Sequence, residues 1–233
     1  MTNTQKFTAY AKDLAFWLER VAVFADPKSP IPDLHNICIT KRVNGIYADA
    51  TDRYRMISRK LEGANVDPDA EFSFTINAKV AQQVAAWAKS AQKNMPKGIH
   101  ARVEVEIDTS TYEHIRVSVM DQAEEYPSAG PENFPHIKPI LDAAEKAAFE
   151  EPASQAICIN SKHLASIAPK GKADPRATLR TISFKKSDNA AKQILFALDD
   201  METGIIQLIR NPEGMPGPER MLTDLKNAEK GND

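Results

Sequence analysis

Apolar and polar positions follow one pattern three times along this chain. Each copy has a short β-prone run, a small residue followed by Lys, and then apolar residues at helical spacing. The runs read FTAYAK, FTINAK and ICINSK, and they end at Lys12, Lys79 and Lys162. Recurrence of this kind indicates a single structural unit used repeatedly. We therefore expect three strand-then-helix openings in one fold.

The first copy continues as a helix followed by strands. From Ala11 to Ala25, apolar residues recur at spacings of three and four and so share one helical face: Leu14, Trp17, Leu18, Val21 and Ala25. Prolines at 27, 30 and 32 then end the helix. Alternation predicts strands at 37–40 and 46–50, joined by the hairpin signal Asn44-Gly45, and a third strand at 54–61. This order is a strand, a helix and an antiparallel meander.

The second and third copies repeat this order. The second has a predicted helix from Ala78 to Gln92, whose buried stripe holds Val80, Val84, Trp87 and Ala91, and strands at 103–107 and 115–119. The third has a short helix ended by Pro169 and Gly171, then alternating positions near 182–184, 194–198 and 206–208. The class is therefore α+β, with repeated strand-helix-meander units and helices on one face of curved sheets.

A Pro-rich segment, EEYPSAGPENFPHIKP, separates the second copy from the third and predicts a boundary. We assign residues 1–127 to one domain with repeat units at 5–63 and 70–122, and residues 128–152 to an interdomain connection. Residues 153–212 form a partial second domain, and residues 213–233 a flexible tail. An Ala-rich stretch at 141–151 is a candidate short helix.

The composition is that of an ordinary globular protein with enough apolar residues to bury a core. Lys and Arg number 30 against 32 Asp and Glu, so any nucleic-acid contact needs local basic faces. The two cysteines, Cys38 and Cys158, have no neighbour at metal-ligand spacing, and we expect no metal and no cofactor. No stretch is apolar enough to span a membrane, and the first residues lack a signal peptide's apolar core. The sequence predicts a reduced, cytoplasmic protein without a membrane partner.

Three segments resemble the bacterial-type DNA polymerase III beta sliding clamp. Residues 50–56, ATDRYRM, are similar to that family's A-T-D-G-H-R-L segment, with Arg53 and Tyr54 in place of Gly and His. Residues 133–141, NFPHIKPIL, resemble the family's connection R-F-P-D-Y-x-x-V-L, and residues 205–210, IIQLIR, its closing V-V-M-P-M-R-L. The resemblance implies a DnaN-like clamp fold, shortened, and a phage or other mobile element as a candidate source.

The resemblance also implies a ring that slides on duplex DNA, lined by helices whose cations meet phosphates without reading sequence. On this hypothesis the chain is a homo-oligomeric processivity factor in DNA replication with no enzymatic activity. Its DNA-facing residues would be Lys12, Arg20, Lys79, Lys89, Lys93, Lys162, Lys170 and Lys172. The alternative is that these side chains form ordinary solvated helix faces. The lysines at the shared repeat position are the better candidates, because a cation near a helix N-terminus is not explained by helix stability.

The family also holds short peptides of polymerases and clamp loaders in an apolar cleft. Carried over by position, the walls of that cleft would be Thr51, Tyr54, Arg55, Met56, Pro135, Ile140, Gln207, Leu208, Ile209 and Arg210. In the alternative interpretation, Met56, Ile140 and Ile209 are ordinary residues of the hydrophobic core and line no cleft. Tyr54 and Gln207 depart from the family pattern.

Two other functions stay open. A clamp-fold interaction module, a decoy or adaptor that does not encircle DNA, would explain why half of a domain is missing relative to the family pattern. An enzyme is less favoured, because Asp49 and Asp52 are not joined by a third carboxylate or a His at suitable spacing, and no P-loop, GxGxxG or GxSxG motif is present.

Overall fold

The computed structural model describes residues 4–143, 161–165, 167, 178–182, 193–199 and 201–207. The first unit contains β1 (Thr4–Tyr10), α1 (Ala11–Ala22), the 3-10 turn η1 (Pro32–His35), β2 (Asn36–Arg42), β3 (Gly45–Thr51), β4 (Arg55–Lys60) and β5 (Asn65–Val66). The second contains β6 (Ser73–Asn77), α2 (Ala78–Lys93), β7 (Arg102–Asp108), β8 (His114–Val119) and β9 (Gln122–Pro127). The predicted order of strand, helix and meander is confirmed in both.

The described part of the third unit holds α4 (Ser161–Ala165), β10 (Thr178–Ile182), β11 (Gln193–Asp199) and β12 (Glu202–Gln207). A short helix at residues 138–143 precedes it. The predicted third opening strand at 157–160 and the tail from 213 lie outside the described residues.

Each opening strand in the first two units runs into its helix without an intervening loop. Tyr10 and Asn77 keep extended backbones, with ψ of 136° and 142°, and the next residue is already helical. At the second junction the Asn77 side chain accepts a hydrogen bond from the backbone N–H of Lys79 at 3.0 Å, which caps α2. The small residue that follows each strand, Ala11 or Ala78, is fully buried there.

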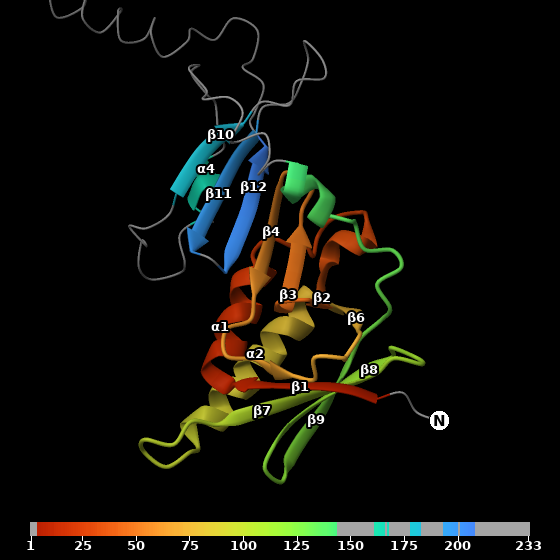
Figure 1. Cartoon of the computed structure of the whole chain (residues 1–233), viewed down its shortest axis with the longest axis vertical. Helices are drawn as coiled ribbons and strands as arrows, with labels where there is room; N and C mark the ends of the chain where they lie inside the picture. The colour runs from red at the N-terminus through yellow and green to blue at the C-terminus, as the bar shows by residue number, and fades with distance from the viewer. Residues whose placement is uncertain are drawn as a thin grey trace, which may run out of the picture.

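The two complete units exchange their opening strands. One sheet has the order β5-β1-β7-β8-β9, so β1 lies beside the meander of the second unit. The other has the order β10-β11-β12-β4-β3-β2-β6, so β6 lies beside the meander of the first unit (Figure 1). All strand pairs are antiparallel, with Phe7 opposite Val105 and Ile37 opposite Ile76. Each unit therefore completes the sheet of the other, and neither forms its sheet alone.

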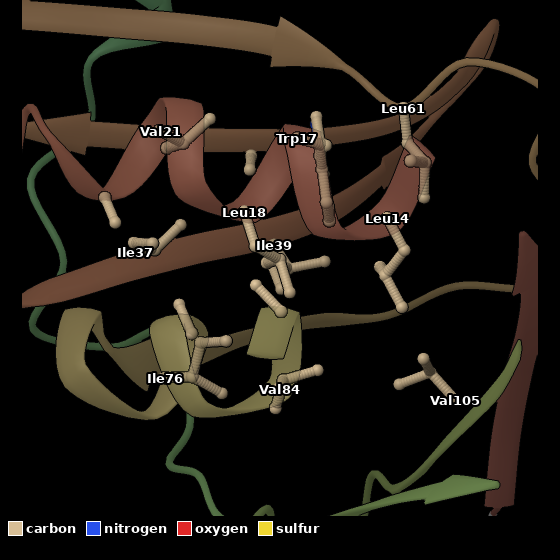
Figure 2. Close-up of a cluster of buried hydrophobic side chains, with 14 of the residues drawn as sticks. Leu14, Trp17, Leu18, Val21, Ile37, Ile39, Leu61, Ile76, Val84 and Val105 are labelled. Atoms are coloured by element: carbon tan, nitrogen blue, oxygen red, sulfur yellow. The ribbon is translucent and has the colours of Figure 1, made fainter. Parts of the chain in front are cut away.

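One apolar core joins both sheets and both long helices. α1 and α2 pack side by side, and Leu14, Trp17, Leu18 and Val21 of α1 meet strand residues such as Ile39 (Figure 2). Trp17 is 1% exposed, and its indole N–H donates to the carbonyl of Arg59 at 2.8 Å, which satisfies the one polar atom of the ring.

The third unit extends the second sheet through β12, which pairs with β4. Gly204 lies at this junction, where a Cβ would come within 2.2 Å of the Phe196 ring and 2.6 Å of the Met56 carbonyl oxygen. Only glycine permits this approach, so the third unit is packed closely against the first.

Element boundaries differ from the predictions in two informative places. α1 ends at Ala22 and not at Ala25, because Phe24 and Ala25 turn back into the core. Strand β9 was not predicted, since its first four residues are exposed and only Tyr126 faces inward. A strand with one apolar residue carries little alternation for sequence analysis to detect.

Candidate functional site

The lysines at the repeat position occupy equivalent places in three helices. Lys12, Lys79 and Lys162 are each the second residue of α1, α2 and α4, and each side chain is exposed. The residue before each of these lysines in α1 and α2, Ala11 or Ala78, is buried, so the lysine lies beside the buried side of its helix. Positive charge at a helix N-terminus opposes the helix dipole. These positions are therefore suited to a ligand that carries negative charge.

The prediction for Arg20 is wrong. Its side chain is 4% exposed and its guanidinium binds the carboxylate of Glu202, with Nη2 to Oε1 at 2.5 Å and Nε to Oε2 at 3.0 Å. Nη2 also donates to the carbonyl of Ile167 at 2.8 Å, and Arg59 donates to Glu202 at 2.6 Å. Glu202 is on β12, far along the chain, so local periodicity does not reveal the buried partner. Arg20 joins the third unit to the first and is unavailable to phosphate.

The other candidate cations fall into two groups. Lys89 and Lys93 are exposed on α2, and the Lys89 ammonium pairs with Glu19 of α1 at 2.6 Å. That pair lowers the net positive charge of the paired helices, although exposed pairs of this kind are weak. Lys170 and Lys172 lie outside the described residues.

The segment that joins β3 to β4 is a tight turn held by its own side chains. Asp52 accepts from the backbone N–H groups of Tyr54 and Arg55 at 3.0 and 2.7 Å, and its other oxygen accepts from Arg55 Nε at 2.8 Å. The hydroxyl of Thr51 donates to the Arg55 carbonyl at 2.8 Å. Thr51 and Arg55, which the resemblance places in the wall of a peptide cleft, hold this turn together through their hydrogen bonds.

Arg53 has a φ of 78°, in the left-handed region that favours glycine. This is the position where the resembling family segment has Gly. The turn therefore keeps the shape that a glycine would allow, although an arginine occupies it.

A small apolar cluster forms where the connection crosses the face of the second sheet opposite α1 and α2. Phe134, Ile137 and Leu141 pack with Cys38 of β2 and Ile205 of β12, and Met56 is packed against them. Of the predicted cleft residues, the structure brings Met56 together with the segment that carries Pro135 and Ile140. Pro135 is half-buried, Ile140 is 40% exposed and Tyr54 is 59% exposed, so apolar surface remains beside the cluster.

Phe134, Ile137, Leu141 and Ile205 belong to this cluster but are not among the predicted cleft residues. The spacing of three and four between the first three was the available signal. The Gln207 backbone ends β12, but its side chain, like Leu208, Ile209 and Arg210, lies outside the description.

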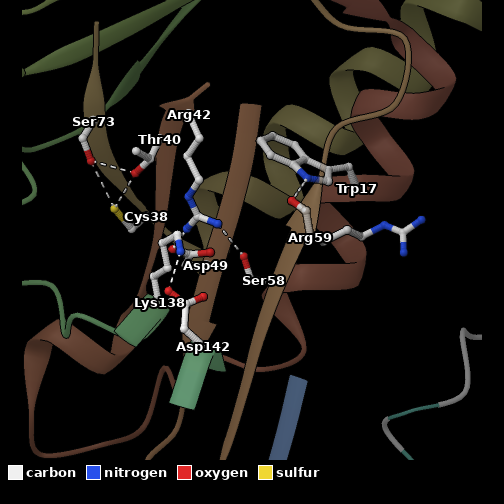
Figure 3. A network of polar contacts seen from close by, with 10 residues as sticks. All are labelled: Trp17, Cys38, Thr40, Arg42, Asp49, Ser58, Arg59, Ser73, Lys138 and Asp142. Atoms are coloured by element: carbon white, nitrogen blue, oxygen red, sulfur yellow. Dashed lines mark hydrogen bonds and ion pairs between the residues drawn. The ribbon is translucent and has the colours of Figure 1, made fainter. Parts of the chain in front are cut away.

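A cavity of about 560 Å³ opens on the same face, between the β2–β3 hairpin, the 138–143 helix and the start of β12. Arg42 binds Asp49 and donates to the Ser58 hydroxyl at 2.9 Å, and Lys138 pairs with Asp142 at 2.5 Å (Figure 3). Arg42, Ser58, Lys138 and Asp142 all line this cavity.

Asp49 is buried behind this cavity, and its Oδ1 has no hydrogen-bond partner among the described residues. Burial raises the pKa of this carboxyl, and the Arg42 guanidinium opposes the rise.

His163 of α4 stacks on Tyr54 with ring centroids 6.1 Å apart. Burial lowers the pKa of His163, and the nearby Arg55 charge adds to the effect. The contact therefore favours the neutral imidazole and ties α4 to the turn between β3 and β4.

Among the described residues, no group of three or more His, Cys, Asp or Glu side chains is arranged to hold a metal ion. In the same part of the chain, no helix combines the length and apolar character needed to cross a membrane.

Comparison with solved structures identifies the fold. The chain is similar to the beta subunit from DNA polymerase of Streptococcus pyogenes, with a TM-score of 0.55 and 10% identity over 92% of this chain and 67% of the other. The DnaN sliding clamps of Pseudomonas aeruginosa and Bartonella birtlesii, both bound to griselimycin, match with TM-scores of 0.54. Their identities are 14% and 12%, over 94% of this chain and 68% of each clamp.

No family model and no curated protein sequence matches the chain. At this identity the likeness establishes the fold, which is the sliding-clamp fold that the three sequence segments predicted.

Proposed function

We propose, from the sliding-clamp fold of this chain, that it is a clamp-like processivity factor that encircles duplex DNA without reading its sequence. In this proposal the helices face the DNA, polymerase or clamp-loader peptides dock on the outside, and several copies of the chain complete the ring. Such a protein acts by topology and needs no catalytic group.

The observation that carries the proposal is the equivalent place of Lys12, Lys79 and Lys162 in their helices, on a fold shared with sliding clamps. Exposed cations repeated at one structural position present phosphates with regularly spaced contacts. Contacts of this kind are salt-sensitive and independent of sequence, which permits sliding. Lys89 and Lys93 of α2 would add to this surface, whereas the buried Arg20 is left out.

The apolar surface near Met56 and Ile140 is the proposed peptide site. Its support is the cluster of Phe134, Ile137, Leu141 and Ile205, which gives a docked apolar side chain a rigid floor. Partly exposed aromatic and aliphatic side chains around a packed floor are typical anchors for short peptides.

For the domain organisation, we propose that residues 1–127 form one clamp domain and residues 153–212 part of a second, joined by the connection at 128–152. The bridge between Thr75 and Ala129 supports this boundary, because the connection begins as a strap against β6.

The test uses the whole chain with a nicked circular duplex. We expect the protein to co-elute with the circle in gel filtration and to be lost when a restriction enzyme linearises the same DNA, because a ring slides off an open end. Equal retention on circle and linear duplex, or no retention on either, contradicts encirclement.

A second candidate is an interaction module that does not encircle DNA, and the pairing of Lys89 with Glu19 favours it by reducing the basic character of the helices. Salt dependence separates the two. A clamp loses duplex affinity steeply between 50 and 200 mM salt, as several phosphate contacts require. A module that binds peptides alone shows no duplex affinity at the lower salt while griselimycin or peptide binding persists.

A further inference from the structure

The cavity between the β2–β3 hairpin and the 138–143 helix is separate from the proposed peptide site. Every residue that lines it belongs to the described part of the chain. Among the described residues, none of those assigned to the peptide cleft lines this cavity. Its volume of about 560 Å³ is typical of sites that hold small molecules.

Asp49 points toward this cavity from the middle of β3. Ala48 and Ala50 belong to the apolar core, so Asp49, which lies between them, projects from the opposite face of the sheet. Tyr47 projects from that same face and lines the cavity, as does Ser58, which lies opposite Asp49 on β4.

The Asp49 carboxylate lies among Arg42, Ser58 and Lys138, which all line the cavity (Figure 3). Asp49 is 6% exposed, and its Oδ2 binds the Arg42 guanidinium. Its Oδ1 is buried and has no hydrogen-bond partner among the described residues. Burial raises the pKa of this carboxyl although Arg42 and Ser58 favour its charged form, so the charge is incompletely compensated. A buried acceptor of this kind calls for an N–H or O–H donor.

A flat surface lies beside this acceptor. The Arg42 guanidinium stacks over the Tyr47 ring, 4.4 Å from the ring centroid. Its ion pair with Asp49 and its hydrogen bond to the Ser58 hydroxyl at 2.9 Å hold it in that orientation. Arg42 and Tyr47 both line the cavity. Aromatic rings and guanidinium planes are surfaces on which nucleobases stack.

The charges around the cavity balance. Arg42 is paired with Asp49, and Lys138 is paired with Asp142 at 2.5 Å. An uncharged ligand leaves both pairs intact, whereas an anion or a cation competes with one of them. The cavity is therefore suited to an uncharged, flat ligand that carries a hydrogen-bond donor.

We propose that this cavity binds a nucleobase that carries an exocyclic amino group, as cytosine, adenine and guanine do. The amino group donates to Asp49 Oδ1, and the ring lies beside the stacked Arg42 and Tyr47. Uracil and thymine have a carbonyl oxygen in place of the cytosine amino group, and the carboxylate repels it. A free nucleoside and an unpaired base of single-stranded DNA present the same chemistry. The site does not require that the chain encircles duplex DNA.

The first experiment compares deoxycytidine with deoxyuridine by isothermal titration calorimetry on the whole chain. The two nucleosides differ at the position where an amino group replaces a carbonyl oxygen and at the adjacent ring nitrogen. We expect deoxycytidine to bind at least about tenfold more tightly, because it alone donates an amino N–H to the charged acceptor.

The second experiment repeats the comparison with Asp49→Asn, which keeps the shape of the side chain. The asparagine carbonyl still accepts from Arg42, so the amide N–H groups take the place of Oδ1 and become donors. We expect the preference to reverse in favour of deoxyuridine, whose carbonyl oxygen accepts from them. A loss of folding cannot produce such a reversal. The matched control is Asp121→Asn, the same change at an exposed position between β8 and β9, which should keep the wild-type preference.

Oligodeoxycytidylate distinguishes the two sources of the base. If the base belongs to single-stranded DNA, the oligonucleotide binds the wild type more tightly than deoxycytidine does, and Asp49→Asn weakens it. If the ligand is a free nucleoside, Asp49→Asn changes the affinity for deoxycytidine alone.

Three results overturn the proposal: equal affinities of the wild type for the two nucleosides, a preference that Asp49→Asn does not change, or no binding at millimolar concentration. Loss of griselimycin binding in Asp49→Asn without any nucleoside binding assigns the cavity to peptides and also overturns it. None of these measurements uses circular DNA, so this proposal and the proposed clamp function can each fail alone.

Discussion

Glu202 of β12 holds the guanidinium of Arg20 of α1 through three hydrogen bonds of 2.5 to 3.1 Å. Arg59 of β4 donates to the same carboxylate at 2.6 Å, so one buried anion lies between two cations from the first unit. The carboxylate is fully buried, and this cluster is the polar junction between the third unit and the clamp domain.

Replacing Glu202 with Gln should lower the free energy of unfolding by about 3–5 kcal/mol, because two buried guanidinium groups lose the carboxylate that they share. Urea denaturation at neutral pH measures the change. The control is Glu19→Gln, next to Arg20 on α1. It removes the exposed partner of Lys89 and should lower the free energy of unfolding by less than about 1 kcal/mol. Equal losses for the two variants would contradict a buried junction.

Arg53→Gly should raise the free energy of unfolding by roughly 0.5–1 kcal/mol. The left-handed backbone at φ 78° is unfavourable for an arginine by roughly 1–2 kcal/mol, and the greater freedom of glycine in the unfolded chain offsets part of the gain. Arg53→Ala is the matched control, since alanine keeps the Cβ and removes the rest of the side chain. Stabilisation by alanine as large as that by glycine would show that backbone strain is not the cause.

Replacing Lys12, Lys79 and Lys162 together with Gln should weaken binding to duplex DNA at all sequences alike. Because each lost phosphate contact lowers the slope of log affinity against log salt by about 0.9, the triple variant should lose up to about three units of slope. Fluorescence anisotropy of a labelled duplex at several salt concentrations measures it. The control replaces Lys6, Lys28 and Lys97, which are exposed but lie outside the starts of the helices; the same loss there would show a non-specific effect of net charge.

If the proposed peptide site takes griselimycin, Ile140→Asp should weaken that binding at least about tenfold, a loss of about 1.4 kcal/mol, by placing a charge on the apolar rim of the site. Griselimycin is a suitable probe because two of the similar sliding clamps contain it. Isothermal titration calorimetry provides the measurement. Ile140 is 40% exposed, so folding should be preserved, and Ile99→Asp is the matched control at a 50% exposed position. Unchanged affinity for Ile140→Asp places the ligand elsewhere.

Asp49 should make the wild type relatively more stable as the pH falls. Burial raises the pKa of this carboxyl in the folded state above its ordinary value of 3.8, so the folded protein takes up a proton more readily than the unfolded chain. The contribution of Asp49 to the free energy of unfolding is therefore least favourable above its folded pKa, where the buried carboxyl is charged. It becomes more favourable as the pH falls toward 3.8. Asp49→Asn lacks this gain.

Urea denaturation of the wild type and Asp49→Asn at pH 7, 6, 5 and 4 tests this. The free energy of unfolding of the wild type, relative to that of Asp49→Asn, should increase as the pH is lowered to 4. Arg42 and Lys138 face the same carboxylate and oppose the rise in its pKa. Parallel profiles for the two proteins, or a difference of opposite sign, would contradict a raised pKa.

The helices and most strands could be predicted because their signals are local. Leu14, Trp17, Leu18 and Val21 lie on one face by spacing alone, and all four are buried as expected. Asn44-Gly45 marks the β2–β3 hairpin, where Gly45 has a positive φ. The repeat of a small residue and a lysine after each opening strand gave the unit that the fold uses.

The pairing of distant elements could not be predicted in this way. Arg20 occupies a helix position that reads as polar surface, and its partner Glu202 is 182 residues away. The exchange of β1 and β6 between units has no local signature. The alternation of apolar and polar residues is equally compatible with an opening strand that pairs with the meander of its own unit. The apolar cluster beneath the proposed peptide site depends on the same kind of contact, between Ile137 of the connection and Ile205 of β12.

The exchanged strands also determine when this protein can fold as it is made. Phe7 has its partner at Val105, so β1 leaves the ribosome roughly 100 residues ahead of the strand that completes its edge. At about 5–20 residues per second, the N-terminal strand waits on the order of 5–20 s with its apolar side chains uncovered. The nascent chain is therefore exposed to misassembly until β7 emerges, and a fragment that stops before residue 102 has no strand with which to close its first sheet.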